Sequence, residues 1–257
     1  MSLSVIVIAR NEAHHIADCL RSAAFADELV VLDSGSTDGT QAIAQSLGAK
    51  VHSTVDWPGF GPQKNRALAL AAGDWVLSLD ADERVTPALK DEILAAMRTG
   101  AHEVYSFPRL SSYCGQYMRH SGWYPDRVPR LFRRGAARFS DDLVHERLVF
   151  SGVCGQLTAD LLHETYEDLE AVLDKVNRYS SAGALDYAAR GKSGSLGKAL
   201  AHGVWAFLRS YFFRRGFLDG KMGFVLAVSN AEASYYRYLK LWLLPKSAEP
   251  SGTSKMR

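Results

Sequence analysis

Cysteines are scarce in this chain of 257 residues, and the three present, Cys19, Cys114 and Cys154, include no pair with the spacing of a metal-binding motif. This scarcity argues against a structural zinc site and is more typical of a reducing compartment than of a secreted protein. No apolar run reaches the length that a membrane-spanning helix needs. The first residues also lack the basic stretch and cleavage site of a signal peptide, so we expect them to form a buried strand.

Glycine-rich phosphate loops are missing as well. No GxGxxG motif follows the first apolar run, and no Gly-Lys-Ser/Thr sequence has the spacing of a P-loop, which argues against both kinds of nucleotide site. Residues 9–12 contain no glycine, which argues against a sugar-1-phosphate nucleotidyltransferase. The basic residues lie among aliphatic and aromatic runs rather than in a solvated stripe, so nucleic-acid binding is not expected.

The charge of the chain is unevenly distributed. The composition is that of a globular protein, with 47% hydrophobic and 23% charged residues and a net charge of +2. Residues 190–257 hold twelve Lys/Arg and three Asp/Glu, a balance of +9, so the first 189 residues carry +2 − 9 = −7. We therefore expect an acidic body and a basic tail that meets an anionic partner.

The first hundred residues alternate between two patterns. Apolar runs typical of buried strands lie at 3–8, 28–32, 50–55 and 75–79, and stretches with helical spacing lie at 14–22, 40–47, 62–72 and from 86 onward. This alternation predicts an α/β fold with a mostly parallel sheet flanked by helices. Ligands bind at the carboxyl ends of such strands, so residues 9–12, 33–40 and 80–83 are predicted to form one rim of one site.

The most informative short motif is Asp80-Ala81-Asp82, directly after the fourth expected strand. Side chains alternate along a strand, so both carboxylates are predicted to point in one direction. Two close carboxylates are well suited to Mg²⁺ or Mn²⁺, with positions left for diphosphate oxygens. The alternative is an ordinary acidic turn at a strand end.

Polar residues also follow the first and second expected strands. Asp33 opens a Gly/Ser/Thr-rich turn, where its carboxylate is expected to accept hydrogen bonds from a nucleobase or a ribose, although Ser36, Thr37 or Asp38 is expected only to cap the next helix. Candidates for contact with phosphate, base or ribose are Arg10, Asn11, Glu12 and, at the start of the third helix, Lys64.

These motifs together resemble family 2 glycosyltransferases with the GT-A fold over residues 3–150. The motifs are VIVIARNE at 5–12, VLDSGSTDGT at 31–40, KNR at 64–66 and LDADE at 79–83. Within the family, the chain is similar to the lipopolysaccharide inner-core β-1,4-glucosyltransferase group through DRVPRLFR at 126–133, VHE at 144–146, KVNRY at 175–179 and GFLDG at 216–220.

The resemblance implies an inverting transfer of a sugar, glucose in that group, from a UDP-sugar to an inner-core heptose. It implies that Asp33 contacts the uridine, Asp80 the ribose or the metal, and Asp82 the metal. We expect a catalytic domain at 1–165, with a nucleotide-sugar half (1–100) and an acceptor half (101–165), a helical basic-aromatic appendage at 166–245, and a flexible tail at 246–257.

Inversion requires a base that deprotonates the acceptor hydroxyl opposite the leaving diphosphate. The interpretation favoured here is Glu146, with His145 orienting it or touching phosphate; Asp141 and Asp142 are the alternatives. The alternative is that Glu146 is an ordinary surface charge paired with Arg133 or Arg147. Phosphate recognition is a further hypothesis for the arginines of the acceptor half, which are Arg127, Arg130 and Arg133.

The C-terminal stretch 204–215 mixes aromatic and basic residues, and two interpretations stay open. It either lies peripherally on an anionic membrane or packs as a hairpin on the catalytic domain. The first fits a protein on the cytoplasmic face of the inner membrane acting on a lipid-linked glycan. Two alternative functions are a UDP-sugar transferase with an undecaprenyl-linked or capsular acceptor and a non-catalytic membrane adaptor.

Overall fold

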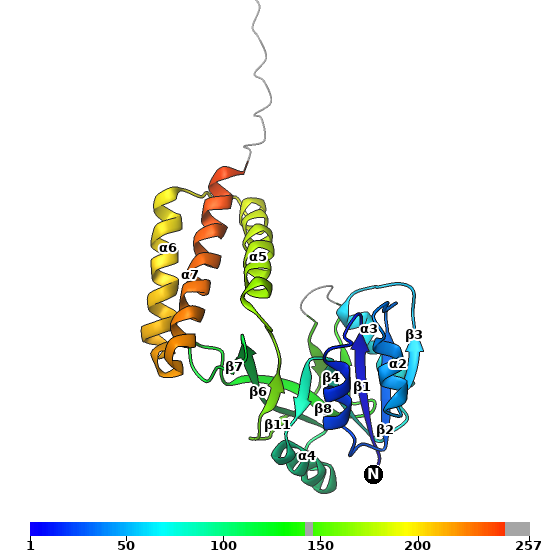
Figure 1. Ribbon diagram of the computed structural model, residues 1–257. Coiled ribbons are helices and arrows are strands. Elements are labelled where there is room, and N and C mark those ends of the chain that lie inside the picture. The colour runs from blue at the N-terminus through cyan, green and yellow to red at the C-terminus, as the bar shows by residue number, and fades with distance from the viewer. Residues whose placement is uncertain (142–145, 245–257) are drawn as a thin grey trace, which may run out of the picture. The chain divides into compact units, whose positions relative to one another are not determined.

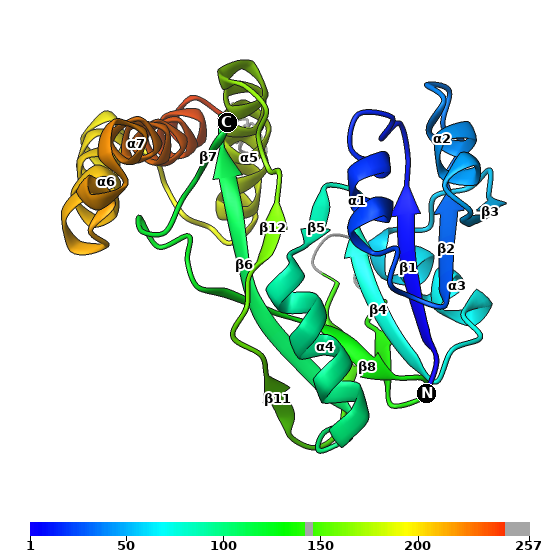
Figure 2. The same cartoon turned by 60° about the horizontal axis from the view of Figure 1, so that its bottom comes forward.

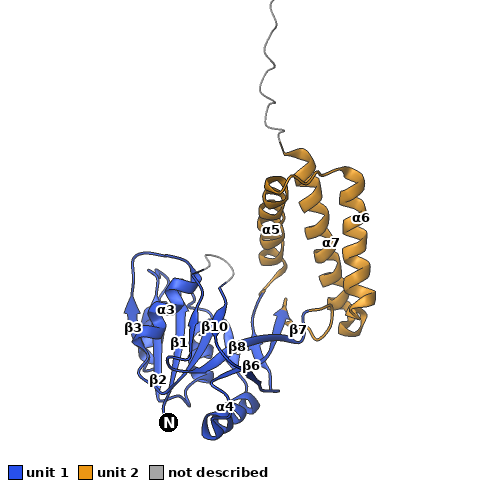
Figure 3. Cartoon of the chain, turned by 180° about the vertical axis from the view of Figure 1, so that it is seen from behind, with its two compact units in different colours: residues 1–112, 123–165 blue, residues 113–122, 166–257 orange. Residues whose placement is uncertain are grey.

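The computed structural model describes residues 1–141 and 146–244 (Figure 1). The chain divides into two compact units (Figure 3): residues 1–112 with 123–165, and residues 113–122 with the rest of the chain from 166. The tail expected at 246–257 lies outside the described residues. Each unit is considered separately below.

The first unit is built on one large sheet. Its strands follow the order β3-β2-β1-β4-β8-β6-β12-β5, and β11 adds to β6. Their bounds are β1 Leu3–Ala9, β2 Glu28–Asp33, β3 Lys50–Ser53, β4 Trp75–Asp80, β5 Glu83–Val85, β6 Val104–Tyr113, β8 Asp126–Arg133, β11 Cys154–Gln156 and β12 Leu161–His163. A separate hairpin joins β9 (Ala137–Phe139) to β10 (Leu148–Phe150).

The four strands β3, β2, β1 and β4 are all parallel, as the sequence predicts. Ala9 pairs with Asp33 and Ile8 with Asp80, so the carboxyl ends of three strands lie next to one another. Beyond β4, strand β8 runs antiparallel to both β4 and β6, which makes the second half of the sheet mixed. The predicted fold class, an α/β sheet flanked by helices and followed by a helical appendage, is confirmed.

Helices cover both faces of this sheet because alternate residues of the buried strand β1 point to opposite sides. Val5 and Val7 pack with α1 (Ile16–Ser22), α2 (Thr40–Ser46) and α4 (Pro87–Thr99), of which α1 and α4 are seen on one side in Figure 2. Ile6 and Ile8 pack on the other side with α3 (Phe60–Leu70) and with Phe132 and Phe139.

The second unit contains three long helices, α5 (Leu169–Ala189), α6 (Leu196–Leu208) and α7 (Gly220–Leu243). Helix α6 gives way to a π-helical turn, η1 (Arg209–Phe213), which is followed by a 3₁₀ turn, η2 (Gly216–Asp219). No helix among the described residues is long and apolar enough to cross a membrane.

Residues 113–122, which include β7 (Gln116–Tyr117), belong to this second unit through Asp219. The carboxylate of Asp219 accepts hydrogen bonds from the backbone N–H groups of Arg119 (3.2 Å) and His120 (2.9 Å). It also lies 2.8 Å from Nδ1 of His120. This buried carboxylate therefore fixes a loop that is distant from it in the sequence.

Glu28, at the start of β2, links several segments of the first unit. Its carboxylate accepts hydrogen bonds from Ser4 Oγ, from Lys50 Nζ at 2.8 Å and from the backbone N–H of Ala72 at 2.9 Å. Burial by itself raises the pKa of Glu28, but the N–H of Ala72 and the side chains of Lys50 and Ser4 lower it from 4.5 to about 2.

The substitution Glu28→Gln is expected to lower the free energy of unfolding by about 1–3 kcal/mol at neutral pH, because the hydrogen bonds to a charged acceptor are lost. The folded pKa lies below the unfolded one, so the ionised carboxylate stabilises the protein above pH 4.5 and loses this effect as the pH falls toward 2. The difference in free energy of unfolding between the wild type and Glu28→Gln, measured by denaturant unfolding, should therefore shrink as the pH falls through this range. Glu103→Gln, at an exposed glutamate, is the control; an advantage that is independent of pH would contradict the assignment.

Candidate active site

The loops after β1 and β2 are joined by hydrogen bonds at the carboxyl edge of the sheet. The backbone N–H of Asn11 donates to Ser36 Oγ (2.8 Å), and Asn11 Oδ1 accepts from the N–H of Thr37 (2.9 Å). The N–H of Glu12 donates to Thr40 Oγ1 at 2.8 Å. Two of the three predicted rim segments are therefore in direct contact, and the amide oxygen of Asn11 serves this contact.

Asp33 is fully buried at the end of β2 and shapes the loop that follows it. Its carboxylate accepts hydrogen bonds from the N–H groups of Gly35 (3.0 Å) and Ser36 (2.9 Å), from the Ser36 hydroxyl and from Gln41 Nε2 (2.6 Å). The N-cap of α2 is Gly39, so none of Ser36, Thr37 and Asp38 occupies the capping position expected in this loop. The carboxylate of Asp38 accepts a hydrogen bond from the N–H of Thr40, the first residue of α2, at 3.1 Å.

A cavity of about 330 Å³ opens beside the end of β1. Arg10 and Glu12 line it together with two aromatic side chains, Trp57 and Phe60, whose rings meet edge to face at 4.9 Å. Sequence reasoning missed both aromatic residues as parts of the site, because they flank Pro58 and Gly59 without a local signal of function; in the structure both side chains are partly exposed. An apolar aromatic wall with polar groups beside it suits a flat heterocycle such as a nucleobase.

Lys64 connects the two halves of the site. Its side chain is only 3% exposed, and Nζ lies 2.8 Å from Asp80 Oδ1 and 2.8 Å from Glu146 Oε1. A buried ammonium group requires such partners, because an unpaired charge in the interior is strongly destabilising. Three residues singled out in the sequence thus meet at one point.

The position of Lys64 depends on a close approach between α3 and the β9–β10 hairpin. A Cβ atom on Gly61 would lie 1.8 Å from the carbonyl oxygen of Ser140, so only glycine fits there. Asn65 fastens the same hairpin, since its side chain donates to the carbonyl of Phe139 and accepts from the N–H of Phe139, both at 2.9 Å. These contacts bring Glu146, which follows the hairpin's first strand, next to Lys64.

Asp80 lies between Lys64 and a second buried cation, Arg130. Arg130 also pairs with the fully buried Glu83 at 3.0 Å, and Arg109 joins Glu83 (3.3 Å) to Asp126 (2.7 Å). Charges therefore alternate in sign along a continuous network. Burial by itself raises the pKa of Asp80, but Arg130 and Lys64 lower it far below its ordinary value. Burial lowers the pKa of Arg130, yet Asp80 and Glu83 raise it above its usual range.

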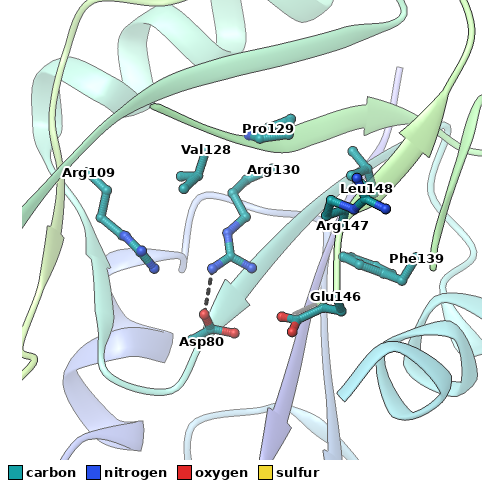
Figure 4. A pocket seen from close by; sticks show the side chains of 9 residues that line it. All are labelled: Asp80, Arg109, Val128, Pro129, Arg130, Phe139, Glu146, Arg147 and Leu148. Atoms are coloured by element: carbon teal, nitrogen blue, oxygen red, sulfur yellow. Dashed lines mark hydrogen bonds and ion pairs between the residues drawn. The ribbon is translucent and has the colours of Figure 1, made fainter. Parts of the chain in front are cut away.

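A cavity of about 450 Å³ opens onto this network. Figure 4 shows Asp80, Arg130 and Glu146 pointing toward one another across it. The remaining lining residues are Arg109, Val128, Pro129, Phe139, Arg147 and Leu148. The space has the size of a small-molecule site and presents carboxylates and guanidinium groups together.

The expectation that Asp80 and Asp82 occupy alternate positions of one strand is wrong for Asp82. Strand β4 ends at Asp80, and Asp82 lies in the turn before β5, so the two carboxylates have separate partners. Asp82 Oδ2 lies 3.3 Å from Nε2 of His163, a residue that sequence reasoning missed. Nδ1 of His163 lies 3.0 Å from both Ser111 Oγ and Thr165 Oγ1, which orient the ring toward Asp82.

The donors around Asp82 fit a divalent cation that takes its other ligands from a substrate. Carboxylate oxygen and imidazole nitrogen are both ligands for Mn²⁺-type ions, and the hydroxyl partners of His163 leave Nε2 to face Asp82. Within residues 1–141 and 146–244, no cluster of three or more His, Cys, Asp or Glu side chains could hold a metal by itself.

The other predicted residues have peripheral places. Arg127 Nη1 donates to the carbonyl of Leu157 at 3.0 Å, and the guanidinium of Arg133 stacks over the Trp75 ring at 5.0 Å. Asp141 is exposed and pairs with Arg138 at 3.8 Å. Asp142 and His145 lie outside the described residues.

Comparison with known proteins gives the family. Residues 4–154 match glycosyl transferase family 2. An uncharacterized glycosyltransferase of Rickettsia typhi is 32% identical over 252 residues, which is 93% of this chain and 86% of that protein. The lipopolysaccharide core biosynthesis glycosyltransferase LpsC of Rhizobium meliloti is 31% identical over 253 residues, which is 94% of this chain and 92% of that protein.

A solved structure is similar over a smaller part. Glucosyl-3-phosphoglycerate synthase from Mycobacterium tuberculosis, in complex with Mn²⁺, uridine diphosphate and glucosyl-3-phosphoglycerate, has 31% sequence identity and a TM-score of 0.37, and the match covers 43% of this chain and 44% of that one. The family match spans more than half of the chain and the relatives align over nearly all of it, so the protein belongs to glycosyl transferase family 2 and is a glycosyltransferase.

Proposed function

We propose that the protein is an inverting, metal-dependent glycosyltransferase that moves glucose from UDP-glucose to an inner-core heptose of lipopolysaccharide. The observation that carries this proposal is Lys64, whose buried ammonium group pairs with both Asp80 and Glu146 beside a cavity of about 450 Å³. The similarity to LpsC over nearly the whole chain supports the choice of acceptor.

The nucleoside of the donor binds at the ends of β1 and β2. In this proposal the uracil lies in the cavity lined by Arg10, Glu12, Trp57 and Phe60, with an aromatic wall beside its ring. Asp33 and Asn11 hold the loop in shape and present it to the base and ribose. This arrangement would exclude water from one face of the base and leave the diphosphate near Asp80.

The diphosphate binds where cations and metal-ligating groups meet. Asp80 and Asp82 are the proposed metal-binding carboxylates, and His163 is added to them because its Nε2 faces Asp82 at 3.3 Å. Asp80, Asp82 and His163 would hold a divalent cation, which would supply positive charge to balance the leaving diphosphate. Lys64 and Arg130, both paired with Asp80, add fixed positive charge to the same region.

Glu146 is the proposed base. Its carboxylate faces the cavity and would take the proton from the attacking hydroxyl of the acceptor as the bond to the sugar forms. Lys64 donates a hydrogen bond to Glu146 at 2.8 Å and so fixes the direction of this carboxylate. The transition state would have oxocarbenium character, with the leaving diphosphate on the opposite face of the sugar.

The acceptor is proposed to be lipid-linked, and the protein would reach it as a peripheral protein on the cytoplasmic face of the inner membrane. A heptose of the lipopolysaccharide core carries its lipid with it, so the enzyme and the membrane surface must meet.

The function is tested by measuring UDP release from a panel of nucleotide-sugars, with an inner-core heptose acceptor, in Mn²⁺, in Mg²⁺ and in EDTA. We expect release from UDP-glucose that depends on the metal and on the acceptor, because charge on the diphosphate must be neutralised. Release of the nucleotide from a different nucleotide-sugar alone would show that this compound, and not UDP-glucose, is the donor. No release from any donor, together with no calorimetric binding of UDP in the presence of metal, would contradict the proposal.

Asp82→Asn and His163→Gln are each expected to weaken Mn²⁺ binding in the presence of UDP at least about ten-fold, because each removes or weakens a metal ligand. Electron paramagnetic resonance of free Mn²⁺ measures this affinity directly. Asp91→Asn, at an exposed carboxylate on α4, is the matched control and should leave the affinity unchanged. Wild-type affinity in both site variants would remove Asp82 and His163 from the metal site.

Glu146→Gln is expected to lower kcat by about 10²- to 10⁴-fold, the usual contribution of a positioned base, while UDP affinity stays the same. Gln keeps the shape of the side chain and can still accept from Lys64. Asp141→Asn, at the exposed alternative candidate, is the control and should retain a normal rate. The reverse pattern, with the loss in Asp141→Asn, would move the base to that residue.

A further inference from the structure

Helix α6 of the second unit is apolar on its exposed side as well as on its packed side. Only Ala199 and Gly203 are buried within it, against the rest of the helical unit. Large apolar side chains face solvent along the helix and the π-helical turn η1. They are Leu196, Leu200, Val204, Trp205, Leu208, Phe212 and Phe213, and the last is 70% exposed. We call these seven residues the α6–η1 surface.

This surface is far more continuous than the exposed apolar residues of α5. In α6, Leu196, Leu200, Val204 and Leu208 follow one another at four-residue spacing, so their side chains form one stripe along the helix. In α5, the exposed residues Leu169, Leu173, Tyr179 and Leu185 are interspersed with charged side chains of both signs. A large contiguous apolar patch on a protein surface marks a place of interaction.

The charges around the α6–η1 surface indicate which kind of partner it binds. Residues 191–218 contain five cationic side chains and no Asp or Glu, and all five are exposed; they are Lys192, Lys198, Arg209, Arg214 and Arg215. A second copy of the same surface would place these cations against one another, which is repulsive. An anionic surface that is apolar underneath would satisfy both the cations and the apolar side chains.

We propose that the α6–η1 surface docks on the interface of an anionic lipid bilayer. Helix α6 would lie in the plane of the membrane, with Val204, Trp205 and Phe213 entering the boundary between head groups and acyl chains and Arg209 meeting lipid phosphates. This inference deepens the proposed function, because it assigns the part of the chain that brings the enzyme to a lipid-linked acceptor.

The apolar contribution is tested by co-sedimentation with phosphatidylcholine vesicles that contain or lack phosphatidylglycerol. We expect the full chain to bind the anionic vesicles and Val204→Glu/Phe213→Glu to bind them at least about ten-fold more weakly. The matched control is Leu185→Glu/Leu173→Glu, which adds the same charge at exposed positions of α5 and should bind as wild type. Equal loss in both pairs would mean that added negative charge, and not this surface, is responsible, and would overturn the proposal.

The cationic contribution is tested by Lys198→Gln/Arg209→Gln. Each cation near an anionic membrane contributes about five-fold in affinity, so the pair should weaken binding about 25-fold, and added salt should reduce the difference. Arg98→Gln/Lys90→Gln on α4 is the control for net charge. Equal wild-type binding to neutral and anionic vesicles, or a dimer in solution that Val204→Glu/Phe213→Glu dissociates, would overturn the proposal.

The proposed membrane docking and the proposed function are tested by separate assays, so either one can be contradicted without the other. Vesicle binding is measured without donor or acceptor, and UDP release is measured with a soluble heptose acceptor and no vesicles. Val204→Glu/Phe213→Glu should keep the wild-type rate in the soluble assay, because neither residue belongs to the first unit. Loss of vesicle binding with a normal soluble rate is the expected result. A protein that binds vesicles but never releases UDP would contradict only the proposed function.

Discussion

The site depends on the pairing of the Lys64 ammonium group with two carboxylates. A buried lysine is tolerated only with close carboxylate partners, and Lys64 has one from each half of the first unit, Asp80 and Glu146, both at 2.8 Å. Gly61 and Asn65 make this geometry possible, since one lets α3 approach the β9–β10 hairpin and the other fastens it. The packing of α3 on the hairpin and the charge pairing in the site therefore depend on the same short segment, residues 61–65.

The topology of the sheet explains why the cations gather around Asp80. Strand β8 inserts antiparallel between β4 and β6, which places Arg130 beside the end of β4. Arg109 on β6 continues the network through Glu83. In the proposed function, the parallel strands provide the loops for the nucleoside, and the mixed half provides the guanidinium groups and the open cavity. The proposed reaction needs both, because its UDP-sugar donor carries a negative diphosphate and the acceptor must approach from the other side.

Local patterns in the sequence predict the parallel half well, because each strand and helix there has its own periodicity and end signals. The helix expected from residue 86 onward, for example, begins with Thr86 as its N-cap and Pro87 next to it. The sequence also indicates Lys64, Asp80 and Glu146 as site residues. It does not predict their contact, because these residues lie far apart in the chain. His163 and Trp57 carry no local signal of function. Asp82 shows the limit of a periodicity argument, since the strand ends two residues before it. The loop 113–122 joins the helical unit through Asp219, a contact that no spacing rule contains.

The proposed reaction is a single displacement in which Glu146 activates the acceptor opposite the diphosphate. The most direct test is the anomeric configuration of the product, read from the coupling constant of its new anomeric proton by nuclear magnetic resonance. UDP-glucose carries an α-linked sugar, so a base acting on the acceptor predicts a β-linked product. An α-linked product would require either a double displacement or a front-face reaction, and would contradict the role assigned to Glu146.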